Sequence, residues 1–244
     1  MLDGTTIALD HSVPRLWIIG GILNLYGDKA MSRVLSMALA LTTVVTTPIT
    51  FAQETTTAVS GNVALASNYI WRGMTQTMDE AAVSGGFDLA HDTGLYLGVW
   101  GSNVDFGADD NMEIDYYGGY SGDAGLLGYD LGYIDYNYPG GSGDFEEWYV
   151  GLSTTAGIFD LGTALSFGLD GAADNVEISA ETEFSGVGIG LTLGDYDNSG
   201  KYHGITLSKE LAGVAISVAW SDYDADAGSA GDQDDLTFTI AKSF

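Results

Sequence analysis

The chain ends with Leu236-Thr237-Phe238-Thr239-Ile240-Ala241-Lys242-Ser243-Phe244. Apolar side chains occupy positions 236, 238, 240 and 244, and mostly small or polar ones stand between them. Because neighbouring side chains of a β-strand point to opposite faces, this segment predicts a strand with one apolar face. A final strand of this kind, ending on an aromatic residue, is typical of a transmembrane β-barrel.

The other end of the sequence has the pattern of an export signal. In residues 31–52, Arg33 precedes an apolar run, and the small residues at Thr50-Phe51-Ala52 suit a signal peptidase. A short membrane anchor is the alternative interpretation. We expect cleavage near Ala52-Gln53, which leaves residues 53–244 as one outer-membrane barrel domain. Residues 1–30 precede the signal, and we interpret them as an over-called N-terminal extension.

The composition excludes several classes of function. The chain has no cysteine, so it has no disulfide, no thiolate metal site and no cysteine nucleophile. After Ala52 no apolar run has the length of a membrane-spanning helix, so strands must do the spanning. Residues 53–244 hold four bases, Arg72, Lys201, Lys209 and Lys242, and a large excess of acids. Such a chain repels nucleic acid and attracts cations.

Residues 53–244 divide into segments of the length that a tilted membrane strand needs. Their alternation of apolar with small or acidic residues predicts an all-β, antiparallel, up-and-down barrel of about twelve strands. The strands of a soluble sandwich also alternate between apolar and polar residues, but their apolar face packs on a second sheet. Here the side chains of the opposite face are mostly Gly, Ala, Ser and acids, which are too small to form a core. We expect strands at 58–67, 81–91, 94–104, 112–121, 127–138, 145–154, 158–169, 175–184, 187–195, 201–211, 213–222 and 235–244.

The connections between these segments alternate between long and short along the chain. The long ones, at 68–80, 105–111, 139–144, 170–174, 195–200 and 223–234, occupy the odd positions and are mostly acidic. An outer-membrane barrel with both termini in the periplasm has its longer loops at the odd, extracellular connections. The alternation therefore supports a barrel in the bacterial outer membrane.

The predicted inward face of the strands is acidic. An acidic lining favours permeating cations over anions, so the pattern predicts a cation-preferring pore. The alternative is a closed, scaffold-like barrel whose acids are only solvated, and a one-residue slip in register would reverse any assignment. The predicted lumen residues are Asp88, Glu113, Asp115, Asp130, Glu147, Asp160, Glu177, Glu181 and Glu183.

The first long connection begins with Asn68-Tyr69-Ile70-Trp71-Arg72-Gly73, which places two aromatic residues and a base at the outer mouth. One interpretation is an interfacial aromatic girdle with a charge-paired Arg72. The other makes Tyr69, Trp71 and Arg72 a constriction or a contact for the solute. The girdle is the simpler of the two and is the one that we favour from the sequence.

Two acidic loops resemble calcium-binding loops only in part. Asp195 and Asp197 begin a run with Gly200 at its sixth position, but Thr206 replaces the bidentate glutamate. The second run, with Asp222, Asp224 and Asp226, lacks the glycine. We therefore interpret both as hairpin loops with weak calcium binding as the alternative. His91 and His203 have no partners that predict catalysis, and we expect neither an enzyme nor a cofactor.

Several segments together resemble the TorF family of porins. They are Ser67–Met74, Gly94–Phe106, Glu113–Tyr120 and Tyr133–Gly140. The final strand also resembles the assembly signal of outer-membrane proteins, although Lys242 departs from it. The resemblance implies a proteobacterial outer-membrane protein that contacts the barrel-assembly machinery through Phe244.

The function predicted from the sequence is passive diffusion of small cationic or neutral solutes across the outer membrane. The expected surroundings are outer-membrane lipid and lipopolysaccharide. The chief alternative is a non-conducting structural or adhesive barrel whose acidic loops bind divalent cations.

Overall fold

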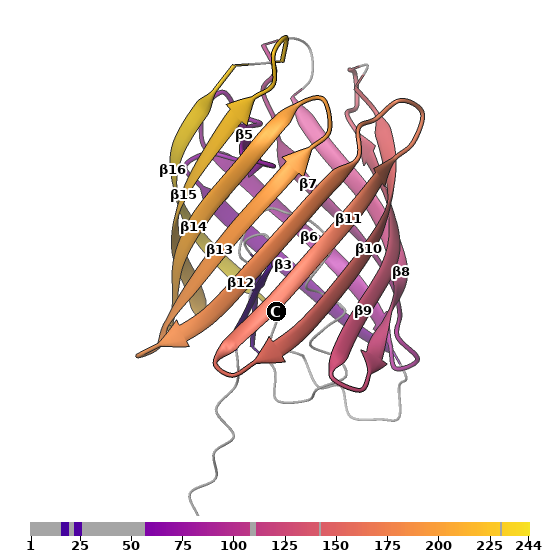
Figure 1. Ribbon diagram of the computed structural model, residues 1–244, viewed down its shortest axis with the longest axis vertical. Helices are drawn as coiled ribbons and strands as arrows, with labels where there is room; N and C mark the ends of the chain where they lie inside the picture. Colours follow the sequence, from indigo (N-terminus) through magenta and orange to yellow (C-terminus); the bar gives the residue numbers. More distant parts are fainter. Residues whose placement is uncertain (1–15, 20–21, 26–56, 108–110, 142, 230) are drawn as a thin grey trace, which may run out of the picture.

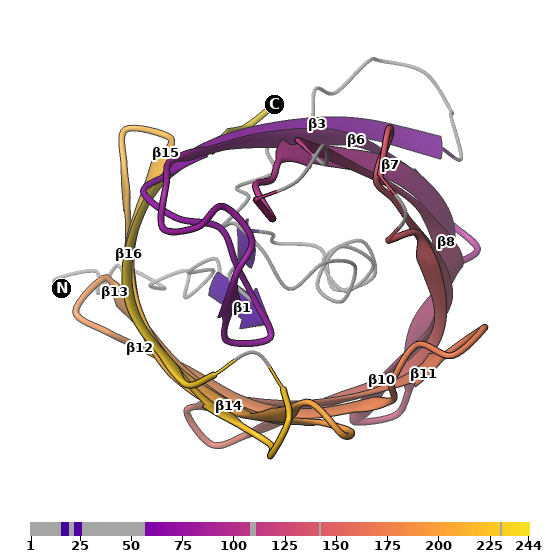
Figure 2. The ribbon, with the colours of Figure 1, turned by 90° about the horizontal axis from the view of Figure 1, so that it is seen from above.

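A closed β-barrel accounts for most of the residues that the structure describes (Figures 1 and 2). The computed structural model describes residues 16–19, 22–25, 57–107, 111–141, 143–229 and 231–244. Its closed sheet has the strand order β10-β11-β12-β13-β14-β15-β16-β3-β6-β7-β8-β9, so each strand pairs antiparallel with its barrel neighbours in sequence. This confirms the predicted all-β, twelve-stranded, up-and-down barrel.

The observed strands follow the predicted segments closely, with the largest differences at the ends of the fourth and eleventh segments. The barrel strands are β3 (Thr57–Ala66), β6 (Ala82–His91), β7 (Leu95–Asn103), β8 (Met112–Ala124), β9 (Leu127–Asn137), β10 (Phe145–Ala156), β11 (Phe159–Gly168), β12 (Asn175–Phe184), β13 (Val187–Tyr196), β14 (Gly200–Leu211), β15 (Val214–Ala225) and β16 (Gln233–Ser243).

Two short hairpins complete the described structure. β4 (Ile70–Trp71) and β5 (Met74–Thr75) form one of them inside the first long connection. β1 (Leu16–Ile19) and β2 (Ile22–Leu25) form the other, which lies against β12 and β13 within the ring of strands (Figure 2). The predicted signal segment, 31–52, and its cleavage point lie outside the described residues.

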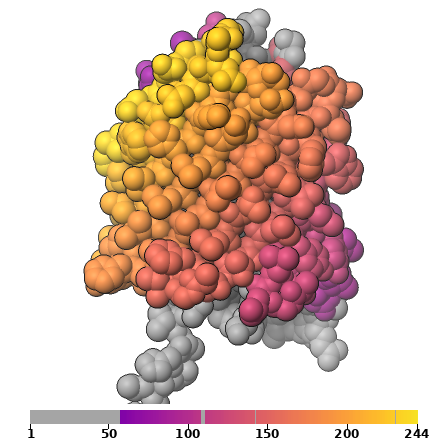
Figure 3. Space-filling view, viewed as in Figure 1, coloured from indigo at the N-terminus to yellow at the C-terminus, as the bar shows by residue number. Residues whose placement is uncertain are grey.

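The outer wall of the barrel is apolar because the alternate side chains of each strand point outward. On β16, Leu236, Phe238 and Ile240 are exposed, whereas Thr237 and Thr239 between them are buried. The same alternation runs through β12, where Val176 and Ile178 are exposed. Figure 3 shows the outer surface that the later strands form. A protein of this shape exposes its apolar side chains to solvent unless lipid covers them.

The barrel closes where its last strand meets its first. β16 pairs with β3 from Thr239↔Ala66 to Ser243↔Asn62. The backbones of Phe244 and Gly61 then exchange two hydrogen bonds of 2.9 and 3.0 Å. Gly61 leaves room for the Phe244 ring, since a Cβ built there would lie 2.9 Å from Phe244 Cε2. The C-terminal segment therefore removes the open edge that an incomplete sheet would expose.

Long and short connections lie at opposite ends of the barrel. The short ones, such as 125–126 and 185–186, join strands at one end, which we name the short-turn end. The first long connection, residues 67–81, lies at the other end, between β3 and β6. Instead of extending outward, it folds back into the barrel (Figure 2). We name residues 67–81 the inward loop.

Candidate functional site

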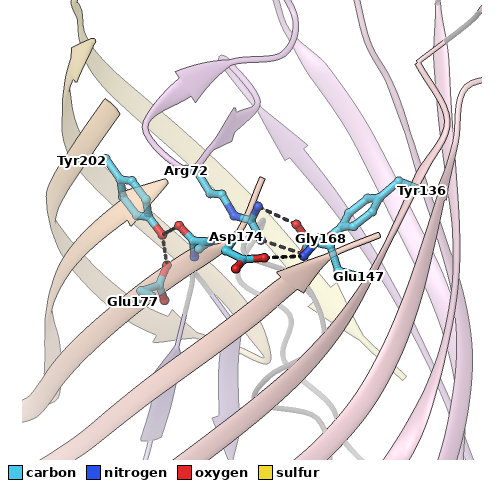
Figure 4. A network of polar contacts seen from close by, with 8 residues as sticks. Arg72, Tyr136, Glu147, Gly168, Asp174, Glu177 and Tyr202 are labelled. Atoms are coloured by element: carbon cyan, nitrogen blue, oxygen red, sulfur yellow. Dashed lines mark hydrogen bonds and ion pairs between the residues drawn. The ribbon is translucent and has the colours of Figure 1, made fainter. Parts of the chain in front are cut away.

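A buried ion pair joins the inward loop to the opposite wall of the barrel. The Arg72 guanidinium donates from Nη1 and Nη2 to the two carboxylate oxygens of Glu147 on β10, each at 2.7 Å (Figure 4). The side chains are only 5% and 1% exposed. Paired donors that match both oxygens of a carboxylate make this one of the strongest polar contacts that a protein forms. Burial lowers the pKa of Arg72, but Glu147 more than compensates, so the pKa lies above its ordinary value.

The turn of the β4–β5 hairpin brings Arg72 to this position. Arg72 and Gly73 both have positive φ angles, 49° and 80°, as the type I′ turn of a two-residue hairpin requires. Gly73 also lies against the barrel wall, because a Cβ built there would be 2.6 Å from Tyr202 Cβ and 3.1 Å from Tyr223 Cβ. The tip of the hairpin therefore reaches β14 and β15, and a larger residue at position 73 would push it away.

Aromatic rings surround the guanidinium. Its Cζ lies 4.2 Å from the centre of the Trp71 ring and 4.8 Å from that of Tyr196, both within the range of cation–π attraction. Trp71 meets Tyr136, Phe145 and Tyr196 edge-on, with centroid distances of 5.4–6.0 Å. Trp71 and Arg72 are buried and point inward because the inward loop folds into the barrel, which contradicts the interfacial girdle. The charge pairing of Arg72 that formed part of the same interpretation is confirmed by Glu147.

Further hydrogen bonds hold the rest of the inward loop. The Tyr69 hydroxyl donates to Glu113 Oε2 on β8 at 2.9 Å, and the Tyr69 ring meets Trp100 of β7 edge-on. The Asn68 amide donates to Asp235 of β16 at 3.1 Å, and the backbone amide of Thr75 donates to Gln233 at 2.8 Å. The loop thus contacts strands on several sides of the barrel, and these contacts fix its position.

A repeated three-strand arrangement stabilises the buried carboxylates on the inner wall. Asp88 stands opposite Gly98, and Gly98 stands opposite Tyr117, on three neighbouring strands. The tyrosine ring lies over the glycine, where a Cβ would collide with it, and the hydroxyl donates to Asp88. We name this arrangement an acid–glycine–tyrosine triplet. The glycine is needed because only a residue without a side chain leaves room for the ring.

The same triplet occurs on the other side of the barrel. Glu177 of β12 stands opposite Gly194 of β13, which stands opposite Tyr202 of β14. Tyr202 crosses the glycine and donates to Glu177 at 2.9 Å (Figure 4). A related contact places the Tyr96 hydroxyl 2.7 Å from Asp130. Inward tyrosines therefore provide hydrogen bonds to carboxylates that lie among few bases.

The structure buries most of the predicted lumen residues on the face opposite the apolar wall. The side chains of Asp88, Glu113, Asp115, Asp130, Glu147, Glu177 and Glu181 are buried. Asp160 is half-buried and accepts a hydrogen bond from Thr155, and Glu183 is exposed near the short-turn end. Their part in conduction stays a prediction. The tyrosine partners of these acids were not predicted from the sequence, although their inward register positions could have indicated them.

The five candidate calcium residues do not form one site. Asp195 lies 3.6 Å from Lys201, and Asp197 accepts a hydrogen bond from Asn198. Asp222 and Asp224 lie near one another on the outward face of β15, and His203 joins them, with ligand atoms within 4.8 Å of one another. His203 was not predicted as part of this group. The backbone of Asp226 takes part in turn hydrogen bonds, and calcium binding stays a prediction.

One model of a bacterial protein family matches the chain. A family model described as "Bacterial protein of unknown function (Gcw_chp)" matches residues 52–244. The chain belongs to the Gcw_chp family. This match covers the whole barrel, and the resemblance of this Gcw_chp protein to the TorF family stays a prediction. No curated protein is similar enough to be matched.

Solved structures share the fold of this Gcw_chp protein at low sequence identity. A chain titled "KdgM porin" has a TM-score of 0.56 at 8% identity, over 76% of this chain and 98% of that one. A membrane protein from a study of in-meso crystallisation has a TM-score of 0.51 at 9% identity, over 76% and 83% of the two chains. OccK8 (OprE) of Pseudomonas aeruginosa scores 0.42 at 13% identity, over 79% and 68%. The first two of these likenesses support the barrel fold.

None of the described residues belongs to a helix with the length and hydropathy needed to cross a bilayer.

Proposed function

We propose that this Gcw_chp protein is an outer-membrane channel for passive diffusion of small solutes, with a preference for cations over anions. The observation that carries the proposal is the charge of the buried inner face. Seven predicted inward carboxylates are buried there, and Arg72 is the only buried base among the described residues. Because Arg72 is paired with Glu147, a net negative charge remains to lower the free energy of a passing cation.

The outer wall supports the membrane location. Exposed apolar side chains cover the outward faces of the strands. Lys209 and Lys242 are outward-facing and close to the short-turn end. There the long side chains can reach the headgroups, where a charge on the lipid face costs only about 0–1 kcal/mol. β1 and β2 precede the proposed cleavage point, so we expect the exported protein to lack them.

A non-conducting barrel is the second candidate, and the inward loop favours it. The loop crosses part of the interior and is held by Arg72–Glu147 and Tyr69–Glu113. If these contacts persist in the membrane and leave no continuous water path, the barrel is a structural protein. Its acidic long connections then provide the contact with lipopolysaccharide and divalent cations.

The reversal potential of the refolded chain, residues 53–244, in a planar bilayer under a salt gradient tests the proposal. Folded barrels should migrate differently on a gel before and after heating, and this difference verifies that the protein added to the bilayer is folded. We expect stepwise conductance with a cation-selective potential. An anion-selective potential contradicts the predicted preference, and the absence of steps from folded protein favours the structural barrel.

A charge-neutralising variant assigns the preference to the inner face. Replacing Glu177, Glu181 and Glu183 together with glutamine should lower the cation preference, because all three occupy inward register positions on β12. The matched control replaces Asp222, Asp224 and Asp234 with asparagine, which removes the same charge from outward positions on β15 and β16. Equal effects of the two triple variants would mean that total charge, rather than the inner lining, sets the selectivity.

A further inference from the structure

Two neighbouring acids on β8 lie in an unusual environment. Glu113 and Asp115 are separated by one residue, so both side chains point to the inner face, and they are 1% and 0% exposed. The Tyr69 hydroxyl donates to Glu113 Oε2. No hydroxyl, amide or basic group among the residues that the structure describes donates to either oxygen of Asp115, and its printed contact is the neighbouring Glu113 carboxyl. Two fully buried carboxylates that meet are costly unless a proton or a cation lies between them, so the pair points to a missing ligand.

The surrounding elements provide no positive charge. On β7, Ser102 stands opposite Glu113 and Trp100 stands opposite Asp115, and on β9 Tyr136 stands opposite Asp115. The inward loop contributes Tyr69 to the pair. Arg72, the buried base among the described residues, donates both arms of its guanidinium to Glu147. The two acids therefore lie together without a base from the described residues to balance them.

We propose that Glu113 and Asp115 hold one divalent cation of the calcium class inside the barrel. Two carboxylates balance the charge of such an ion and offer the oxygen atoms that a hard cation prefers. An organic ammonium ion is bulkier and needs more open space than a side chain with no exposed surface indicates. The inference rests on the proposed cation preference and adds a specific site to it: a divalent ion binds here and obstructs the passage of monovalent ions.

Terbium luminescence provides a binding test that does not depend on conduction. Trp100 lies directly across from Asp115, so its excitation should sensitise a Tb³⁺ ion held there. For the refolded chain, residues 53–244, we expect a saturable signal that Ca²⁺ displaces at about 10⁻⁴–10⁻³ M, the range of weak extracellular calcium sites. Replacing Trp100 with phenylalanine should remove most of this signal.

Charge-neutral variants locate the ion. Asp115→Asn and, separately, Glu113→Gln should each raise the Ca²⁺ concentration needed to displace Tb³⁺ by about tenfold or more. The reason is that affinity follows the number of charged ligands. Asp88→Asn is the matched control, since Asp88 is also buried and inward but has the Tyr117 hydroxyl as its partner. If one variant fails to fold, the other still decides. Wild-type binding in both variants, or no sensitised signal at any pH that ionises the acids, overturns the site.

Bilayer recordings then separate this inference from the proposed function. Millimolar Ca²⁺ should reduce the monovalent current of the wild-type channel and have little effect on Asp115→Asn. A cation-selective current that Ca²⁺ reduces equally in both proteins overturns the site and leaves the channel function intact. Terbium binding that depends on Asp115, without any conductance, supports the site and contradicts the channel.

Discussion

Arg72 and Glu147 show how strongly one residue pair can determine the arrangement of the barrel interior. Both charges are buried, and each is the other's main partner. Removing one side leaves an uncompensated buried charge, which costs about 3–5 kcal/mol. We expect Arg72→Ala and Glu147→Ala each to lower the free energy of unfolding by that amount, and the double variant to lose less than the sum.

Urea unfolding of the refolded barrel measures this double-mutant cycle. The coupling between the two positions is the quantity of interest, because it isolates the pair from the packing that each side chain provides. Additive losses in the double variant would show that the ion pair contributes no specific stability, and that the aromatic rings alone hold the loop.

Gly98 is a single residue that permits the hydrogen bond between Tyr117 and Asp88. It separates Asp88 from Tyr117, and a Cβ at this position would overlap the tyrosine ring. We expect Gly98→Ala to destabilise the barrel by about 1–3 kcal/mol, the usual cost of overpacking a filled site. Gly143→Ala is the control, since its Cβ would meet only Tyr138 Cδ2 at 3.6 Å. Equal stability of the two variants in urea would contradict the role assigned to the triplet.

The sequence could predict which acids point inward but not what they contact. Alternation assigns Asp88 and Glu177 to the inner face without knowledge of any other strand. Their tyrosine partners, Tyr117 and Tyr202, lie two strands away, so finding them requires the register of two strand pairs. The hydrophobic pattern fixes the face of each residue, but a shift of two residues keeps every side chain on its face, so the pattern alone does not give the pairing of the strands.

At the scale of elements, the inward loop is the segment whose position matters most for conduction. Its hairpin reaches from β3 and β6 to Glu147 on β10. We expect replacement of residues 69–78 with a short Gly-Ser linker to raise the single-channel conductance, because the linker cannot reach these partners. The control replaces residues 226–229, a part of the last long connection, with Gly and Ser. Unchanged conductance in the first variant would place the loop outside the path of the ions.

The inward loop also marks where prediction of the elements from sequence stops. The barrel strands have a clear period of two over many residues, and their existence and approximate bounds were predicted correctly. β4 and β5 have two residues each, too few for any period to be visible. Their position follows from contacts with distant strands, such as Gly73 against Tyr202, which no local pattern contains.

The closing strand provides a prediction about assembly. Phe244 completes the β16–β3 seam, and its ring packs over Gly61. We expect Phe244→Ala to lower the fraction of barrel that assembles in cells, because it changes both this seam and the proposed signal for the assembly machinery. Phe238→Ala removes an outward aromatic side chain from the same strand and is the control. The measurement is the heat-modifiable fraction in outer membranes, and equal losses would argue against a special role for the terminal residue.

At the scale of the whole molecule, the two halves of the inner wall differ. Buried tyrosines and the inward loop concentrate near β7, β8, β9 and β10. The inner face of β11 to β16 mainly has small side chains, among them Ser166, Ser208, Ser217, Thr237 and Thr239. In a barrel cleaved at the proposed point, we expect any solute path to run closer to the second half, with carboxylates such as Glu177 and Glu181 beside it.

This arrangement predicts how selectivity depends on salt. The Debye length falls from about 10 Å at 0.1 M to about 3 Å at 1 M, so distant charges lose their influence on an ion in a water-filled path. If the preference arises from the summed field of the acidic wall, the reversal potential at a fixed concentration ratio should move toward zero as both solutions become more concentrated. The Glu177, Glu181 and Glu183 triple variant should show a weaker dependence, because less field remains to be screened. A preference that persists at high salt in the wild type and depends on Asp115 would instead assign selectivity to direct contact of the ion with the β8 pair.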